Sequence, residues 1–107
     1  MAATINIVMG FVHGQNIDSG STPLMHGSDF QSETIVGVTT TVRSALVADK
    51  GRNRNVVRIC PLSGNVYVKC GLPGVVVASS SDGIYVAEGN PEYFALQDGD
   101  TIALVEA

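Results

Sequence analysis

The sequence is poor in several kinds of residue, and each shortage narrows the class of protein. Its 107 residues include no tryptophan, 6% aromatic residues, 15% charged residues and two cysteines. No apolar run approaches the roughly 18 residues that a membrane-spanning helix needs, and the N-terminus lacks the basic start and long apolar stretch of a signal peptide. We therefore expect a soluble protein that is not exported and has no membrane partner.

The residues that are abundant favour β-structure. The chain is 45% hydrophobic, and its β-branched residues are 15 Val, 7 Ile and 7 Thr, against 6 Leu. Such side chains lose rotamer freedom in a helix and pack well on a pleated sheet. The high apolar and low charged content excludes a disordered chain. A chain of this length has room for one hydrophobic core and not for two.

Short apolar stretches separated by Gly, Pro, Asn and Asp predict six to eight strands. The expected strands are 4–9 with an extension to 12, 33–44 as one strand or as two with a bend at Gly37, 55–60, 65–70, 84–87, 92–96 and 101–105. This pattern predicts an all-β fold, a single small β-sandwich of jelly-roll type spanning residues 1–107. Residues 1–32 would form an N-terminal strand and a long loop or arm, and residues 33–107 the core strands.

Two hairpins are predicted from the turn residues. The first joins 55–60 to 65–70 around Pro61–Gly64, with Ile59 opposite Val66 and Val57 opposite Val68 on one apolar face. The second places the Asp98-Gly99 turn between 92–96 and 101–105.

The first hairpin also sets the distance between the two cysteines. Cys60 and Cys70 would lie about five residues apart along its ladder, on the order of 16 Å, which is beyond disulfide reach. We therefore expect two free thiols, with Cys70 continuing the apolar face of its strand.

A long polar region follows the first strand. Residues 13–32 are rich in Gly, Ser, Asn, Asp and Pro, and Leu24, Met25 and Phe30 are isolated apolar anchors within it. A loop of that length in a compact domain is usually functional, unless it hides an undetected element. Leu24, Met25 and Phe30 are therefore predicted to contact a partner or a neighbouring subunit, and packing of the loop on its own domain is the alternative.

Charge is unevenly distributed along the chain. Four of the six cations are Lys50, Arg52, Arg54 and Arg58, whereas the last 26 residues hold six acids and no base. Lys50, Arg52 and Arg54 are predicted to meet the acidic third of a neighbouring copy, or else to form a solvated loop. Nucleic acid is not an expected partner, because the net charge is −4 and no aromatic residues are interleaved with the cations.

Chemistry-bearing residues are few. His13 and His26 lie in no recognisable nucleophile or acid–base signature, and with the two cysteines they form no closely spaced pair of zinc ligands. No glycine-rich nucleotide-binding motif is present. The expected protein is therefore not an enzyme and carries no metal and no cofactor.

The C-terminal half resembles a family of small proteins encoded among the virion genes of tailed bacteriophages. The resemblance covers the predicted strand 56–60, the following strand that ends at Gly71, and the C-terminal segments 85–96 and 99–105. The Glu92-Tyr93-Phe94 triplet followed by the Gly99-Asp100 turn and the Ile102–Val105 strand is its most diagnostic part. The start of the chain, Ala3–Ile7, is also similar.

This resemblance implies a capsid decoration, or cement, protein on the exterior of the virion head. Its partners would be the major capsid protein and further copies of itself, in a trimer. A tail or head–tail accessory protein is the alternative within the virion. A small carbohydrate-binding module for a host surface is the alternative from another class, although three tyrosines and no tryptophan provide little for stacking on sugars.

Overall fold

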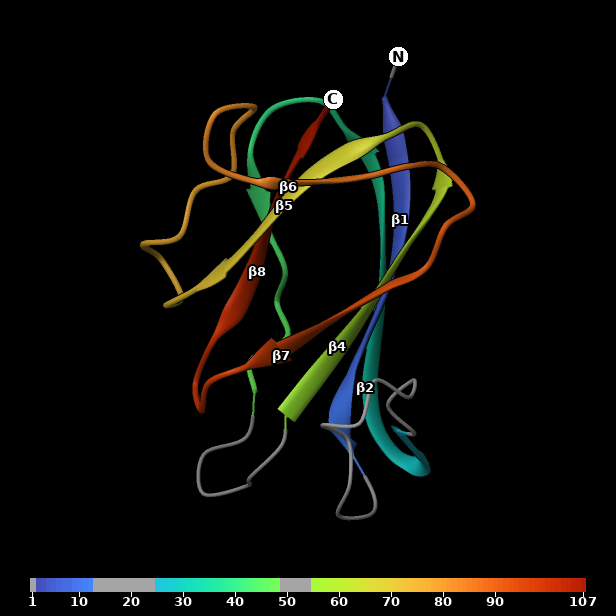
Figure 1. Cartoon of the computed structure of the whole chain (residues 1–107), viewed down its shortest axis with the longest axis vertical. Helices are drawn as coiled ribbons and strands as arrows, with labels where there is room; N and C mark the ends of the chain where they lie inside the picture. Colours follow the sequence, from blue (N-terminus) through green and yellow to red (C-terminus); the bar gives the residue numbers. More distant parts are fainter. Residues whose placement is uncertain (1, 13–24, 49–54) are drawn as a thin grey trace.

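The computed structural model describes residues 2–12, 25–48 and 55–107, which form two antiparallel sheets packed face to face (Figure 1). The predicted all-β sandwich is confirmed. Sheet A has the strand order β2-β1-β4-β7 and sheet B the order β3-β8-β5-β6. The strands are β1 (Ala3–Val12), β2 (Met25–Val38), β3 (Val42–Arg43), β4 (Asn55–Ser63), β5 (Val66–Gly71), β6 (Ile84–Val86), β7 (Glu92–Leu96) and β8 (Thr101–Glu106).

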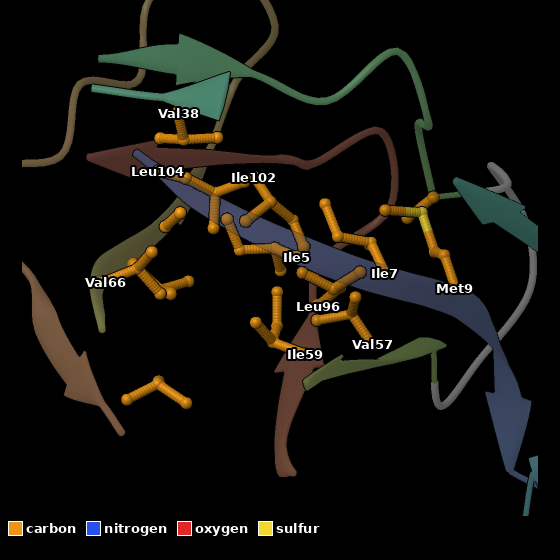
Figure 2. Close-up of a cluster of buried hydrophobic side chains, with 14 residues drawn as sticks. Ile5, Ile7, Met9, Val38, Val57, Ile59, Val66, Leu96, Ile102 and Leu104 are labelled. Atoms are coloured by element: carbon orange, nitrogen blue, oxygen red, sulfur yellow. The ribbon is translucent and has the colours of Figure 1, made fainter. Parts of the chain in front are cut away.

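Alternate residues of both sheets meet in one apolar core. In β1, Ile5, Ile7 and Met9 are almost fully buried while the residues between them are half-exposed, which is the period-2 pattern of a strand with one buried face. Strands β4 and β5 contribute in the same way. Ile102 and Leu104 of β8 complete the core, and Figure 2 shows these side chains meeting between the sheets. The shared core contains Ile5, Ile7, Met9, Val38, Val57, Ile59, Val66, Val68, Val86, Leu96, Ile102 and Leu104.

The chain repeatedly crosses from one sheet to the other. Five of the seven connections between successive described strands change sheet, and only β1–β2 and β5–β6 are neighbours in both sequence and space. Gly64, Gly89 and Gly99 lie at three of these crossings, and Gly37 lies in β2 one residue before a fourth, each with φ between 76° and 83°. Since L-residues with a side chain adopt this left-handed conformation at a cost, glycine lets the chain turn there without strain.

The first predicted hairpin is wrong. Strand β4 runs on through Pro61 to Ser63 in sheet A, where it pairs with β1 and β7, and β5 belongs to sheet B. Only Gly64 and Asn65 connect them. The three Cα–Cα steps from Ser63 to Val66 reach at most about 11 Å, which matches the separation of about 10 Å between packed sheets. Ile59 and Val66 are both buried as predicted, but they enter the core from opposite sheets and do not share a ladder.

The second predicted hairpin is wrong for the same reason. Strand β7 pairs with β4 in sheet A, and β8 pairs with β5 and β3 in sheet B, so the Asp98-Gly99 turn links the two sheets. A hairpin and a sheet-to-sheet crossing both need inward-facing apolar residues at every second position and a left-handed glycine in the turn. The local sequence therefore does not distinguish them.

Strand structure in the N-terminal region is more extensive than predicted, because β2 begins at Met25. Residues 25–32, expected in the long polar loop, belong to β2, which pairs with β1 from Val12↔Met25 to Ala3↔Val38. Strand β1 does extend to Val12, as the longer prediction had it. The stretch 33–44 forms two strands, β2 and β3, which agrees with the prediction of two strands near Gly37.

Neighbouring crossings are tied to each other at one end of the sandwich. The Gly64 N–H donates to Glu88 Oε1 at 2.6 Å, and the Gly89 N–H donates to the Pro61 carbonyl at 2.8 Å. Asn65 Oδ1 accepts from the Glu88 N–H at 2.8 Å. These bonds join the β4–β5 connection to the β6–β7 connection, so both crossings are fixed by hydrogen bonds and not only by the core.

Substitution of two crossing glycines tests this arrangement. A Cβ at Gly64 would lie 3.0 Å from the Cβ of Ala3, whereas a Cβ at Gly89 would meet nothing within 4 Å. Both Gly64→Ala and Gly89→Ala incur the left-handed cost of about 1–2 kcal/mol, and Gly64→Ala adds about 1 kcal/mol or more from overpacking. Urea unfolding of both variants measures the difference. Equal losses of stability would contradict the tight approach of Gly64 to β1.

Candidate protein-interaction surface

The connection from β5 to β6 forms a third layer on the outer face of sheet B. We call this segment, Leu72–Gly83, the strap. Val76 and Ala78 are buried against Ala103 and Val105, the residues of β8 that point away from the main core. Figure 1 shows the connection leaving the end of β5 and returning to β6 along the same side of the molecule. The strap therefore gives sheet B a second, smaller apolar core.

Polar side chains from the end of sheet B hold the strap in place. Arg43 Nε–H donates to the Val76 carbonyl at 2.7 Å, and Thr41 Oγ1–H donates to the Ala78 carbonyl at 3.0 Å. The strap then turns back on itself, because Ser79 and Asp82 exchange backbone hydrogen bonds of 3.3 and 3.2 Å. Lys69 on β5 forms an ion pair with Asp82 at the returning end. Bonds from three sides thus fix a segment that has no strand pairing of its own.

Burial alternates along the strap, so the residues next to Val76 and Ala78 point away from sheet B and are exposed. Leu72, Val75 and Val77 are 60%, 69% and 49% exposed, and we call these three residues the strap surface. They line a hollow of about 410 Å³ beside the end of β5. Of the ten large apolar side chains exposed in the described part of the chain, five lie between Leu72 and Tyr85.

Charged groups near the hollow neutralise each other. Lys69 and Asp82 line it, with their side chains 40% and 63% exposed. Arg43, which donates to the carbonyl of Val76, and Asp100, whose charge acts on Cys70, add one further charge of each sign beside residues that line the hollow. The strap surface therefore presents apolar groups in a locally neutral setting on a chain whose net charge is −4.

Cys70 lies between the core and the hollow. Its side chain packs against the main core from the end of β5 and also lines the hollow. Burial, and then the negative charge of Asp100, raise the pKa of the Cys70 thiol to about 11. A thiol with so high a pKa is almost entirely protonated at neutral pH and is a poor nucleophile. Both cysteines are free, as predicted, and they lie on strands of opposite sheets.

The tyrosines do not form a common surface. Tyr67 and Tyr85 pack edge to face on the outer side of sheet B, with ring centroids 5.7 Å apart and an interplanar angle of 66°. Tyr93 lies on the opposite sheet, in β7. The stacking platform expected of a carbohydrate-binding module is therefore limited to one ring pair.

Of the predicted contact residues, Phe30 is the one whose side chain the structure describes, and it lies on a different sheet from the strap surface. Phe30 is 47% exposed and lies on the outer face of sheet A, opposite Gly10 of β1. Met25 begins β2, and its backbone pairs with Val12. The other four predicted residues, Leu24, Lys50, Arg52 and Arg54, lie outside the described residues.

The acidic C-terminal third has local structural tasks. Glu88 binds the Gly64 N–H, Asp98 accepts from Asn55 Nδ2 at 3.0 Å, and Asp100 accepts from the Gln97 N–H at 3.3 Å. Asp82 pairs with Lys69. Four of the six acids therefore stabilise turns, crossings or the strap.

Sequence reasoning missed the strap surface. Val75–Ala78 follow the Gly71–Gly74 break and precede a serine-rich turn, which leaves too short an apolar run to span a sheet. The signal available in the sequence was a run of four apolar residues that is too short to form a strand of the sandwich. Such a run indicates a segment that packs on the surface of a sheet. Exposure at alternate positions could not be deduced without knowing that β8 lies beneath.

Searches for related proteins found none: no family model, curated protein or solved structure matches the chain. Within residues 2–12, 25–48 and 55–107, no cluster of His, Cys, Asp and Glu side chains could hold a metal ion. The same residues contain no helix long and apolar enough to span a membrane.

Alkylation of Cys70 tests its placement. In a Cys60→Ser variant, iodoacetamide at pH 8 should label Cys70 at least tenfold more slowly in the native protein than in urea, because the native thiol is rarely ionised. The native rate should rise as pH increases from about 9 to about 11. Mass spectrometry of quenched samples measures the label. Equal rates in the native and urea-unfolded protein would show that Cys70 is not held in the core.

Proposed function

We propose that this chain is a structural virion protein, a capsid decoration or cement protein that binds the exterior of a bacteriophage head through the strap surface. The observation that carries the proposal is the strap surface itself. Leu72, Val75 and Val77 are exposed together around one hollow, and the segment that presents them is anchored to a closed sandwich. Clustered exposed apolar residues on a small soluble domain are typical of a protein–protein contact.

The anchoring of the strap favours a docking role. A loop that must become ordered on binding loses conformational entropy and therefore affinity. Here Arg43 and Thr41 hold the strap carbonyls, and Val76 and Ala78 pack on β8, so the strap surface is ordered before any partner arrives. Each docked copy then retains most of the free energy of its apolar contact.

A decoration protein gains its effect from copy number. Pressure from packaged DNA pulls the shell subunits apart, and a rigid domain that bridges a joint adds contact area that must be lost before the joint opens. Many copies multiply a modest gain per site. A short domain closed by hydrogen-bonded crossings at one end suits this work, because it transmits load without deforming.

The resemblance to phage virion proteins supports the same proposal from the sequence. Its most diagnostic residues, 85–96 and 99–105, form β6, β7 and β8 together with the crossings at Gly89 and Gly99. In this chain the resembling motif therefore encodes the connections that close the sandwich. The partner in this proposal is the major capsid protein, and the location is the outside of the head.

A head-binding assay with paired leucine variants tests the proposal. Leu72 on the strap and Leu62 on the outer face of sheet A are 60% and 57% exposed, so they form a matched pair. Wild-type protein should sediment with purified heads that lack it. Leu72→Ser should weaken binding about tenfold, as expected for an apolar residue central to an interface, and Leu62→Ser should bind like wild type.

Three results would contradict the proposal. Sedimentation with isolated tails and not with heads would favour the tail or head–tail alternative. Binding to neither particle would remove the virion function. If Leu62→Ser lost head binding and Leu72→Ser bound like wild type, the contact would lie on sheet A.

A further inference from the structure

Among the residues that the structure describes, no strand pairs with the outer edge of β2 in sheet A. Strand β2 is the longest strand, with 14 residues, and β1 pairs with one side of it. No backbone hydrogen bond joins Phe30–Val36 to another segment on the other side, among the residues that the structure describes. Such an edge offers a row of N–H and C=O groups to a further strand.

The other three sheet edges are less suited to pairing. Strands β3 and β6 have two and three residues, and β7 has five and begins with Glu92. Proteins protect exposed edges with short strands, prolines and charges. Residues 30–36 contain no proline and one charged residue, Glu33. This edge therefore lacks the usual protection.

Electrostatics restrict where a second copy of this chain can pair. Copies with a net charge of −4 repel each other, so self-association needs a surface without unbalanced negative charge. The carboxylate of Glu33 points to the inner side of sheet A, where Oε1 accepts from Ser44 Oγ at 2.6 Å and from the Ala45 N–H at 3.1 Å. These two donors partly compensate its charge, and the outward-facing side chains of the segment are uncharged.

The exposed side chains of the edge are also self-complementary. Phe30 and Val36 are 47% and 75% exposed, and they lie three residues to either side of Glu33. An antiparallel pairing centred on Glu33 places Phe30 of each copy opposite Val36 of the other, and Ser32 opposite Thr34. Apolar residues then meet apolar residues, and hydroxyl groups meet hydroxyl groups, which are favourable cross-strand pairs. The same pairing also places the two Glu33 residues opposite each other, and this like-charge pair costs stability. The hydrogen bonds from Ser44 and Ala45 to each Glu33 carboxylate reduce that cost.

We infer that two copies of the chain pair through β2 in this register, which joins their A sheets into one continuous sheet around a two-fold axis. The contact is isologous, so each copy supplies the same surface. It gives a dimer in place of the trimer that the family resemblance implies. The strap surface lies on sheet B, away from this edge, so a dimer presents two strap surfaces.

The mass of the purified protein tests the inference without any phage head, so its failure is separate from failure of the proposed function. Light scattering after gel filtration should give twice 11.1 kDa. Val36→Lys should raise the dimer dissociation constant at least tenfold, because it places a cation opposite Phe30 at both ends of the contact. The control is Val75→Lys on the strap, where the valine is 69% exposed.

A monomeric or trimeric wild-type protein would overturn the inference. Equal dissociation constants for Val36→Lys and Val75→Lys would also overturn it.

A disulfide tests the register. In a background with Cys60→Ser and Cys70→Ala, the pair Ser32→Cys and Thr34→Cys should give covalent dimers under mild oxidation, because directly opposed residues in an antiparallel pair lie about 4.5–5.5 Å apart between Cα atoms. Each single substitution should give at least tenfold fewer covalent dimers. The introduced cysteine and the same cysteine in the other copy are then diagonal neighbours, which lie farther apart than directly opposed residues. Circular dichroism of the cysteine-free background checks that it folds.

Equal cross-linking by a single substitution would show a different register, and no cross-linking by the pair would show that β2 is not the contact. Either result contradicts the inference.

Discussion

The packing of two apolar sheet faces against each other is the interaction on which the rest of the structure depends. Ile5, Ile7, Ile59, Ile102 and Leu104 are fully buried between the sheets, and burial of such a side chain contributes about 1.5–3 kcal/mol. Because five of the seven connections join strands of opposite sheets, most of them must pass over an open end of this core. The fold therefore depends on how firmly these crossings are held.

The crossings explain how so short a chain can hold the strap, which has no strand pairing, in position. Gly64 and Gly89 turn the chain in the left-handed conformation, and hydrogen bonds join the two connections. With its inner face filled and its crossings fixed, sheet B can carry a further layer on its outer face. The strap uses this support: Val76 and Ala78 pack down on β8, and Leu72, Val75 and Val77 face outward. The proposed contact surface is thus a consequence of the closed sandwich beneath it.

The same arrangement separates two surfaces with different proposed tasks. The strap surface belongs to sheet B, and the outer edge of β2 belongs to sheet A. If β2 joins two copies, each dimer carries two strap surfaces in fixed geometry, and attachment of the first raises the effective concentration of the second. This coupling is what a cement protein needs, since the dimer then bridges two places on a shell with no flexible linker between them.

For two strands, the sequence predicted which residues face inward but not which strands are neighbours. The period-2 pattern in 55–60 and 65–70 identified Val57, Ile59, Val66 and Val68 as the apolar face, because alternation depends only on having one buried face. Pairing depends on tertiary contacts that local sequence does not record, so both predicted hairpins were wrong although Ile59, Val66 and their equivalents were correctly assigned to the apolar face. Residues 25–32 were missed as a strand because Met25 and Phe30 are their only large apolar residues, which leaves no apolar alternation to detect. The strap surface was missed because its partner layer, the outer face of β8, is distant in sequence.

A cryo-electron microscopy map of heads saturated with the protein would locate the surface that touches the shell. The strap, residues 72–83 between β5 and β6, should face the shell, with the hollow beside β5 covered. A map in which sheet A faces the shell and the strap points to solvent would contradict the account.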